Sequence, residues 1–130
     1  MRILLDTQAW LWLQTTPERL SDGALEAVSD PGNDLFLSAA SAWEIAIKYN
    51  LGKLPLPEPP AEYVPGRLTT SGTAPLPVEH RHALHVASLP RHHRDPFDRL
   101  LVAQGRLDGL TILTADAQLG AYDVAILPAE

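Results

Sequence analysis

Four carboxylates have the side-chain type and the positions needed to gather around a divalent metal ion: Asp6, Glu44, Asp98 and Asp116. Each is embedded in apolar sequence, where an isolated negative charge is unfavourable unless it is paired or bound to a metal. All-oxygen ligands suit Mg²⁺ or Mn²⁺ better than Zn²⁺. Such an ion lowers the pKa of a bound water and stabilises charge on a phosphodiester, so the pattern favours metal-dependent hydrolysis.

Asp6 and Asp116 each follow a short apolar run that predicts a buried strand, Arg2 to Leu5 and Leu110 to Thr114. The carboxyl ends of parallel strands meet at one edge of a sheet, where ligands bind. Either carboxylate could equally cap the helix that follows it, and both interpretations stay open. The Thr114 hydroxyl at the second strand end could donate to a neighbouring carboxylate or a metal-bound water.

Glu44 lies in a helical segment whose apolar residues point in several directions. Trp43 and Ile47 belong to one apolar row and Ile45 to another face, which predicts a helix buried on most sides with Glu44 inside the protein. The alternative is a surface ion pair with Lys48, four residues further on.

Asp95 and Asp98 belong to one segment, D-P-F-D. Asp95 precedes Pro96, a combination typical of the start of a helix, so Asp95 is expected to cap it. Asp98 would satisfy amides of the first turn, but it shares a stripe with Leu101 and Val102 that should face the sheet. We therefore expect the Asp98 carboxylate at the mouth of that stripe, pointing into the crevice.

Strands are expected to alternate with helices, which indicates an α/β domain with a mainly parallel sheet. Residues 61–70 are ambiguous because Pro65 and Gly66 should interrupt a helix there. The expected strands span residues 2–5, 35–37, 76–78, 110–113 and 124–127; the expected helices span 7–13, 21–28, 38 or 41 to about 50, 79–88, 95–107 and 116–119.

The length of 130 residues suits one domain, 1–130. A formal net charge of -6 argues against a broadly basic nucleic-acid-binding surface, although it permits an acidic centre with a local basic rim. No apolar window reaches the ~18 residues of a membrane span, and the first residues do not have the pattern of a secretory signal. With no cysteine in the chain, we expect a cytoplasmic protein with no membrane partner.

A basic segment follows the predicted helix 79–88: Arg91, His92, His93 and Arg94. It is a candidate for contact with RNA phosphates, and the alternative is a solvated loop. The chain holds five histidines, which permits a zinc site, but their spacing matches no metalloprotease motif. Of Trp10 and Trp12, on opposing faces of the first helix, one is expected in the core and the other at an interface.

The chain resembles the PIN-domain ribonucleases, in particular the VapC-type toxins of VapBC toxin–antitoxin pairs. The resemblance spans nearly the whole chain in the family's order and is most specific in its third segment. The segments that carry it are I-L-L-D-T at Ile3 to Thr7, S-A-W-E-I-A-I-K at Ser41 to Lys48, D-P-F-D-R-L-L-V-A-Q at Asp95 to Gln104, and L-T-A-D at Leu113 to Asp116.

The resemblance implies a three-layer α/β/α domain and an acidic quartet that binds Mg²⁺ or Mn²⁺. It also implies cleavage of structured RNA, such as tRNA or ribosomal RNA, to 3′-hydroxyl and 5′-phosphate ends. A homodimer is implied, together with a cognate antitoxin that covers the site and contacts DNA through its own domain. The implied quartet is Asp6, Glu44, Asp98 and Asp116, with Asp95, Thr7 and Thr114 in supporting positions.

Two other classes of function compete with a nuclease. A phosphohydrolase would use Asp6 as a nucleophile, but the dehalogenase pattern requires a second Asp where Gln8 stands. A receiver domain would require a Lys at a late strand end, and none lies near Leu113 or Ile126. The second competing class is an inactive domain that only binds RNA or a partner, and the complete acidic set argues against it.

Overall fold

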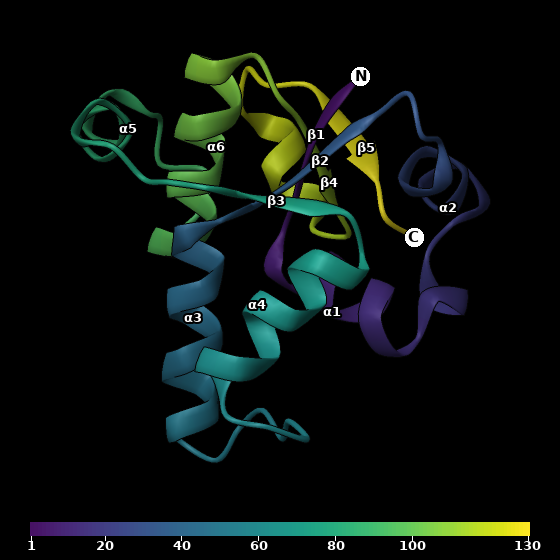
Figure 1. The fold of residues 1–130 in the computed structure, drawn as a ribbon. Helices are drawn as coiled ribbons and strands as arrows, with labels where there is room; N and C mark the ends of the chain where they lie inside the picture. Colours follow the sequence, from purple (N-terminus) through teal and green to yellow (C-terminus); the bar gives the residue numbers. More distant parts are fainter.

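The computed structural model describes residues 1–130, which form a five-stranded parallel sheet with six α-helices around it (Figure 1). None of these helices has the length and hydrophobicity needed to cross a bilayer. The strands are β1 (Arg2–Leu5), β2 (Asp34–Ser38), β3 (Thr73–Leu76), β4 (Thr111–Thr114) and β5 (Ile126–Pro128). The helices are α1 (Thr7–Thr15), α2 (Asp22–Ser29), α3 (Ala39–Asn50), α4 (Pro60–Thr70), α5 (His80–His85) and α6 (Pro96–Asp108), with 3₁₀ turns η1 (Pro17–Arg19), η2 (Val86–Ser88) and η3 (Ala117–Ala121).

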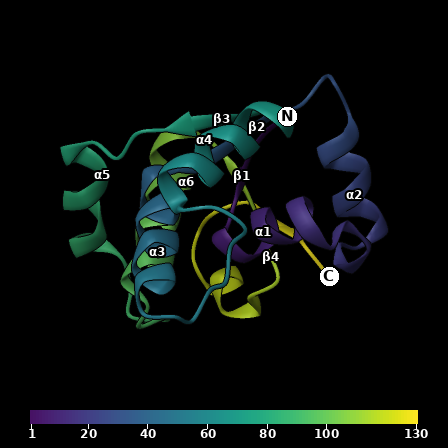
Figure 2. The same ribbon diagram turned by 60° about the horizontal axis from the view of Figure 1, so that its bottom comes forward.

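Alternation along the strands separates two hydrophobic cores, because successive side chains of a strand point to opposite faces. In β1, Ile3 and Leu5 face a core shared with α1 to α4, whereas Leu4 faces a core shared with α6. Figure 2 places α5 at one side of the molecule and α2 at the other. The expected three-layer α/β/α architecture with a parallel central sheet is confirmed.

The strand order β3-β2-β1-β4-β5 puts β1 at the centre. The chain adds β2 on one side of β1 and β4 on the other, and all pairings are parallel. Such a reversal of strand order opens a crevice at the carboxyl ends of the strands. The residues directly after β1 and β4 therefore meet at this edge.

Helix α4 differs from the sequence expectation, since it runs unbroken through Pro65 and Gly66. Proline removes one backbone donor from a helix, but Pro65 and Ala61, the residue four positions before it, are both exposed. The freed carbonyl of Ala61 can therefore bind water. Tyr63 and Val64 on the opposite face are buried in the core, and this packing outweighs the local effect of proline.

The two edge strands begin or end at other residues than predicted. β3 is Thr73–Leu76 instead of 76–78, and β5 is Ile126–Pro128 instead of 124–127. Each contains a proline, Pro75 or Pro128, which reads locally as the end of a strand. At a sheet edge a proline can turn its missing donor side away from the neighbouring strand, so these strands tolerate it.

The prediction that one of Trp10 and Trp12 lies at an interface is wrong, because both are buried. Trp10 packs in the core and its indole N–H donates to Thr73 Oγ1 at 3.3 Å. The guanidinium of Arg19 covers the Trp12 ring at 4.4 Å from its centroid. The exposed tryptophan is Trp43 of α3, of which 62% is accessible.

Close packing of α6 on the sheet depends on Gly105. A Cβ at this position would lie 2.9 Å from Val124 Cγ2 and 3.2 Å from side-chain carbons of Ile112. We expect Gly105→Ala to lower the free energy of unfolding by about 1–2 kcal/mol, because overpacking outweighs the gain in helix propensity. Urea denaturation measures the change. Gly23→Ala in α2 is the matched control, since nothing lies within 4 Å of its Cβ; equal effects of the two substitutions would contradict the packing argument.

Candidate metal centre

Two candidate carboxylates follow the central strands and cap the next element. Asp6 Oδ1 accepts from the Ala9 amide at 2.7 Å, and its Oδ2 accepts from the Thr114 hydroxyl at 2.5 Å. Asp116 Oδ1 accepts from the Gln118 amide at 2.9 Å. Both side chains also line the cleft at the carboxyl edge of the sheet. The capping and the cleft interpretations are thus compatible, because each carboxylate has further lone pairs.

Glu44 reaches the same cleft from α3 and is only 8% exposed. Its Oε1 accepts from the Thr7 hydroxyl at 2.6 Å, and its Oε2 pairs with Lys48 Nζ at 2.8 Å. The expectation that α3 is buried on most sides is wrong, since Trp43 and Ile47 are exposed. Glu44 itself is buried because its face of α3 packs on α1, and the ion pair offsets part of the resulting charge.

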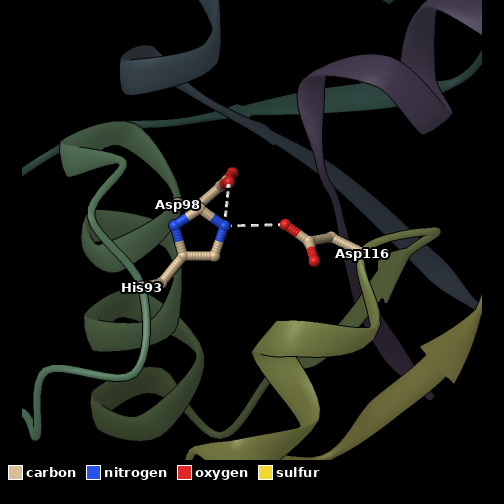
Figure 3. Close-up of side chains that lie close together, drawn as sticks. All are labelled: His93, Asp98 and Asp116. Carbon is tan, nitrogen blue, oxygen red and sulfur yellow. Dashed lines mark hydrogen bonds and ion pairs between the residues drawn. The ribbon is translucent and has the colours of Figure 1, made fainter.

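Asp95 and Asp98 stand at the start of α6. Asp95 Oδ1 accepts from the amides of Phe97 at 2.9 Å and of Asp98 at 3.4 Å, so Asp95 caps the helix as expected. The Asp98 carboxylate accepts no hydrogen bond from an amide or a hydroxyl. Its polar contact is His93 Nε2, 3.3 Å from Oδ2 (Figure 3). Asp98 is therefore the least supported of the four carboxylates.

The charge around Asp98 is strongly unbalanced. Burial raises the pKa of this carboxyl to about 7, and the negative charges of Asp95, Asp6 and Glu44 add to the shift while His93 opposes it. The surroundings of a carboxylic acid with a pKa this high favour its neutral, protonated form. A divalent cation would relieve the same imbalance without a proton. The residues present thus fit an ion with oxygen ligands.

The pKa values of Asp6 and Asp116 are shifted in opposite directions. Burial raises the pKa of Asp6 above its ordinary value, although the Thr114 hydroxyl and the Ala9 amide act the other way. At the more open Asp116, burial is outweighed by hydrogen bonds from the Gln118 amide and from His93, which lower the pKa. Asp116 is therefore ionised at neutral pH. The pKa values of Asp6 and Asp98 are raised, so a bound cation would favour the charged forms of these two carboxyls.

All the acidic residues singled out in the sequence line one cleft, together with Thr7. Thr114 contributes indirectly, because its hydroxyl donates a hydrogen bond to the Asp6 carboxylate. The histidines do not gather into a zinc site. The one cluster of metal-ligand side chains within 4.8 Å joins His93 to Asp98 and Asp116. The acidic members of the cleft are Asp6, Glu44, Asp95, Asp98 and Asp116.

The basic segment lies beside this cleft. Arg91 and Arg94 are exposed and line a neighbouring hollow with His93 and Arg99. The His93 ring turns inward to the carboxylates, whereas His92 packs edge-on against Tyr122, 5.0 Å between ring centroids. Arg91 and Arg94 are thus the free cations of the segment.

Lysines of the cleft rim and Arg99 were not singled out as functional in the sequence. Lys48 and Lys53 line the cleft, and hydrogen bonding to Glu44 raises the pKa of Lys48. The spacing of Glu44 and Lys48 was a signal for their pairing but not for their place in a cleft. Arg99 donates to the carbonyls of Val86 at 3.0 Å and Pro90 at 2.9 Å, contacts that no local pattern indicates.

This combination of a parallel α/β/α fold and an acidic cleft is matched by a known family. The family model described as PIN domain covers residues 3–125 of the chain. The chain therefore belongs to the PIN-domain family.

A segment of 58 residues is 62% identical to Ribonuclease VapC16 of Mycobacterium tuberculosis. This segment is 45% of the chain and 41% of that relative, so the match spans less than half of either protein.

Solved structures share the fold at low sequence identity. One is VapBC2 from Rickettsia felis bound to a DNA fragment from their promoter, with a TM-score of 0.74 and 13% identity over 100% of both chains. Another is a toxin–antitoxin complex from Klebsiella pneumoniae, with a TM-score of 0.66 and 17% identity over 98% of both chains. At this level of identity the likeness concerns the fold.

Proposed function

We propose that this protein is a metal-dependent endoribonuclease, a VapC-type toxin that hydrolyses phosphodiester bonds of structured RNA such as tRNA or ribosomal RNA. The observation that carries the proposal is the convergence of Asp6, Glu44, Asp98 and Asp116 on one cleft with more negative charge than their neighbours neutralise. The PIN-domain membership and the segment similar to Ribonuclease VapC16 support it.

The side chains of such a site would have different roles. Asp6, Glu44, Asp98 and Asp116 would hold Mg²⁺ or Mn²⁺. A bound ion of this kind supplies an activated water and neutralises charge on a phosphodiester. The hydroxyl of Thr114 fixes the orientation of the Asp6 carboxylate. Lys48 offers a cation at the rim, where its side chain is half exposed.

The partners follow from the same proposal. Residues 1–130 would act as one domain, as a homodimer in the cytoplasm, with RNA as substrate. A cognate antitoxin would cover the acidic cleft and would be the only link to DNA. The solved complexes of similar fold support an antitoxin as the partner.

Incubation of the purified, antitoxin-free protein with total cellular RNA tests the activity. We expect discrete fragments with 5′-phosphate ends in Mn²⁺ or Mg²⁺ and none in excess chelator. RNA binding without cleavage under every metal condition would indicate an inactive binding domain. A phosphorylated Asp6 after incubation with a phosphate donor would instead indicate a phosphohydrolase.

Arg91→Ala combined with Arg94→Ala should weaken RNA binding, because both guanidinium groups are exposed beside the cleft. Each lost phosphate contact reduces the dependence of log K on log salt by roughly 1. Binding to RNA in chelator at several salt concentrations measures both effects. Arg106→Ala, at an exposed position near the other end of α6, is the control. An unchanged affinity and salt dependence in the double variant would argue against an RNA path over this segment.

A further inference from the structure

The His93 imidazole lies between two carboxylates of the centre (Figure 3). Its Nε2 is 2.7 Å from Asp116 Oδ2 and 3.3 Å from Asp98 Oδ2. Possible ligand atoms of the three residues all lie within 4.8 Å of one another. Judged by distance alone, His93 would be a nitrogen ligand of the metal, alongside Asp98 and Asp116.

The other ring nitrogen argues against ligation. His93 Nδ1 accepts a hydrogen bond from the backbone N–H of Asp95 at 3.0 Å. A nitrogen that accepts an N–H carries no proton, so the proton of the neutral ring sits on Nε2. A histidine that binds a metal through Nε2 carries its remaining proton on Nδ1. That proton would point at the Asp95 N–H, and the hydrogen bond would be lost.

The backbone of the segment around His93 is held by Tyr122 and Arg99. The His93 amide donates to Tyr122 Oη at 3.0 Å, and Arg99 donates to the same oxygen at 3.3 Å. Arg99 also donates to the Pro90 carbonyl at 2.9 Å. The side chain of His93 is only 13% exposed. The backbone at His93 and the Nδ1 side of its ring are thus held by contacts that do not involve the carboxylates.

We propose that His93 is a positioning residue that donates its Nε2 proton to the carboxylate of Asp116, with Asp98 alongside, and stays outside the coordination sphere of the metal. The inference rests on the proposed metal centre and adds a role for a residue of the basic segment. Hydrogen bonds to ligating carboxylates fix their orientation, and loss of such a partner typically weakens metal binding by about 10–100-fold.

Mn²⁺ binding to the whole chain tests this role without reference to activity. Electron paramagnetic resonance gives the affinity, and electron spin echo modulation detects a ¹⁴N nucleus bound directly to Mn²⁺. We compare the wild type with His93→Ala, which has no donor, and His93→Gln, whose amide offers both an N–H donor and an acceptor. His92→Gln on the same segment, where the ring packs on Tyr122, is the matched control.

We expect no directly bound ¹⁴N that depends on His93, an Mn²⁺ affinity about 10–100-fold lower in His93→Ala, and most of the affinity retained in both Gln variants. A ¹⁴N coupling that disappears in His93→Ala would overturn the proposal and make His93 a ligand. Unchanged affinity in His93→Ala would also overturn it. A wild-type protein that binds no Mn²⁺ would overturn the metal centre itself, and the inference with it.

Discussion

Asp98→Asn should lower the rate of metal-dependent RNA cleavage by roughly a thousandfold while the protein stays folded. The substitution keeps the size of the side chain but removes the charge of the carboxylate that has the fewest hydrogen bonds in the site. Metal catalysis contributes several kcal/mol to transition-state stabilisation, and about 4 kcal/mol corresponds to roughly a thousandfold in rate. Initial rates on a defined RNA at saturating Mn²⁺ measure the loss.

Asp95→Asn is the matched control for this experiment. Asn caps a helix about as well as Asp, so the capping contacts to Phe97 and Asp98 should survive. We expect most of the activity to remain. Equal losses in the two variants would mean that Asp95 also serves the metal, and wild-type cleavage by Asp98→Asn would rule out the centre as described.

The same carboxyl should make the metal-free protein less stable as the pH rises. The native pKa of Asp98 is about 7, above the ordinary value of 3.8. Between these values the native state binds a proton that the unfolded state lacks, so the free energy of unfolding falls as pH rises. Below pH 4 both states hold the proton and the penalty is absent, whereas above pH 7 it is complete. At 1.36 kcal/mol per pH unit the limit is about 4 kcal/mol, and with 21% of the side chain exposed we expect about 2 kcal/mol.

Urea denaturation of Asp98→Asn and wild type in chelator isolates this contribution. The variant should be more stable by about 2 kcal/mol at pH 8, and the difference should vanish near pH 4. Adding Mg²⁺ at pH 8 should stabilise the wild type more than the variant, because ligand binding to the native state shifts the unfolding equilibrium. A difference between the proteins that is constant from pH 4 to 8 would mean that Asp98 titrates normally.

The sequence pattern identifies Asp6, Glu44 and Asp116 because each charge either follows an apolar run or lies inside an apolar helix, and it identifies Asp98 by the stripe it shares with Leu101 and Val102. Asp6 and Asp116 were found through strand ends, and the parallel order of β1 and β4 then brings them together. The sequence pattern predicts the burial of Glu44 correctly, but the reason, a helix buried on most sides, is wrong because Trp43 of α3 is exposed. Its burial comes from the face of α3 that packs on α1.

Features that depend on distant contacts were beyond the reach of local pattern. Helix α4 persists through Pro65 because Tyr63 and Val64 are buried, and this burial is a tertiary effect. The backbone at His93 is held by Tyr122, 29 residues away, whose hydroxyl oxygen accepts from the His93 amide. In the sequence, residues 91–94 indicate phosphate contact equally for all four members of the basic segment. In the structure, His93 instead turns toward the carboxylates of the cleft.

The hydrogen bond from Thr114 to Asp6 joins residues 108 positions apart, and this span has a consequence for synthesis. Asp6 and Glu44 are made early, but Asp98 and Asp116 come from the last third of the sequence, and β4 must pair with β1 before the cleft exists. A nascent chain on the ribosome therefore lacks at least one member of the acidic set until translation has passed residue 116. The proposed nuclease activity can therefore arise only after this segment has left the ribosome, which leaves an interval in which the proposed antitoxin can bind.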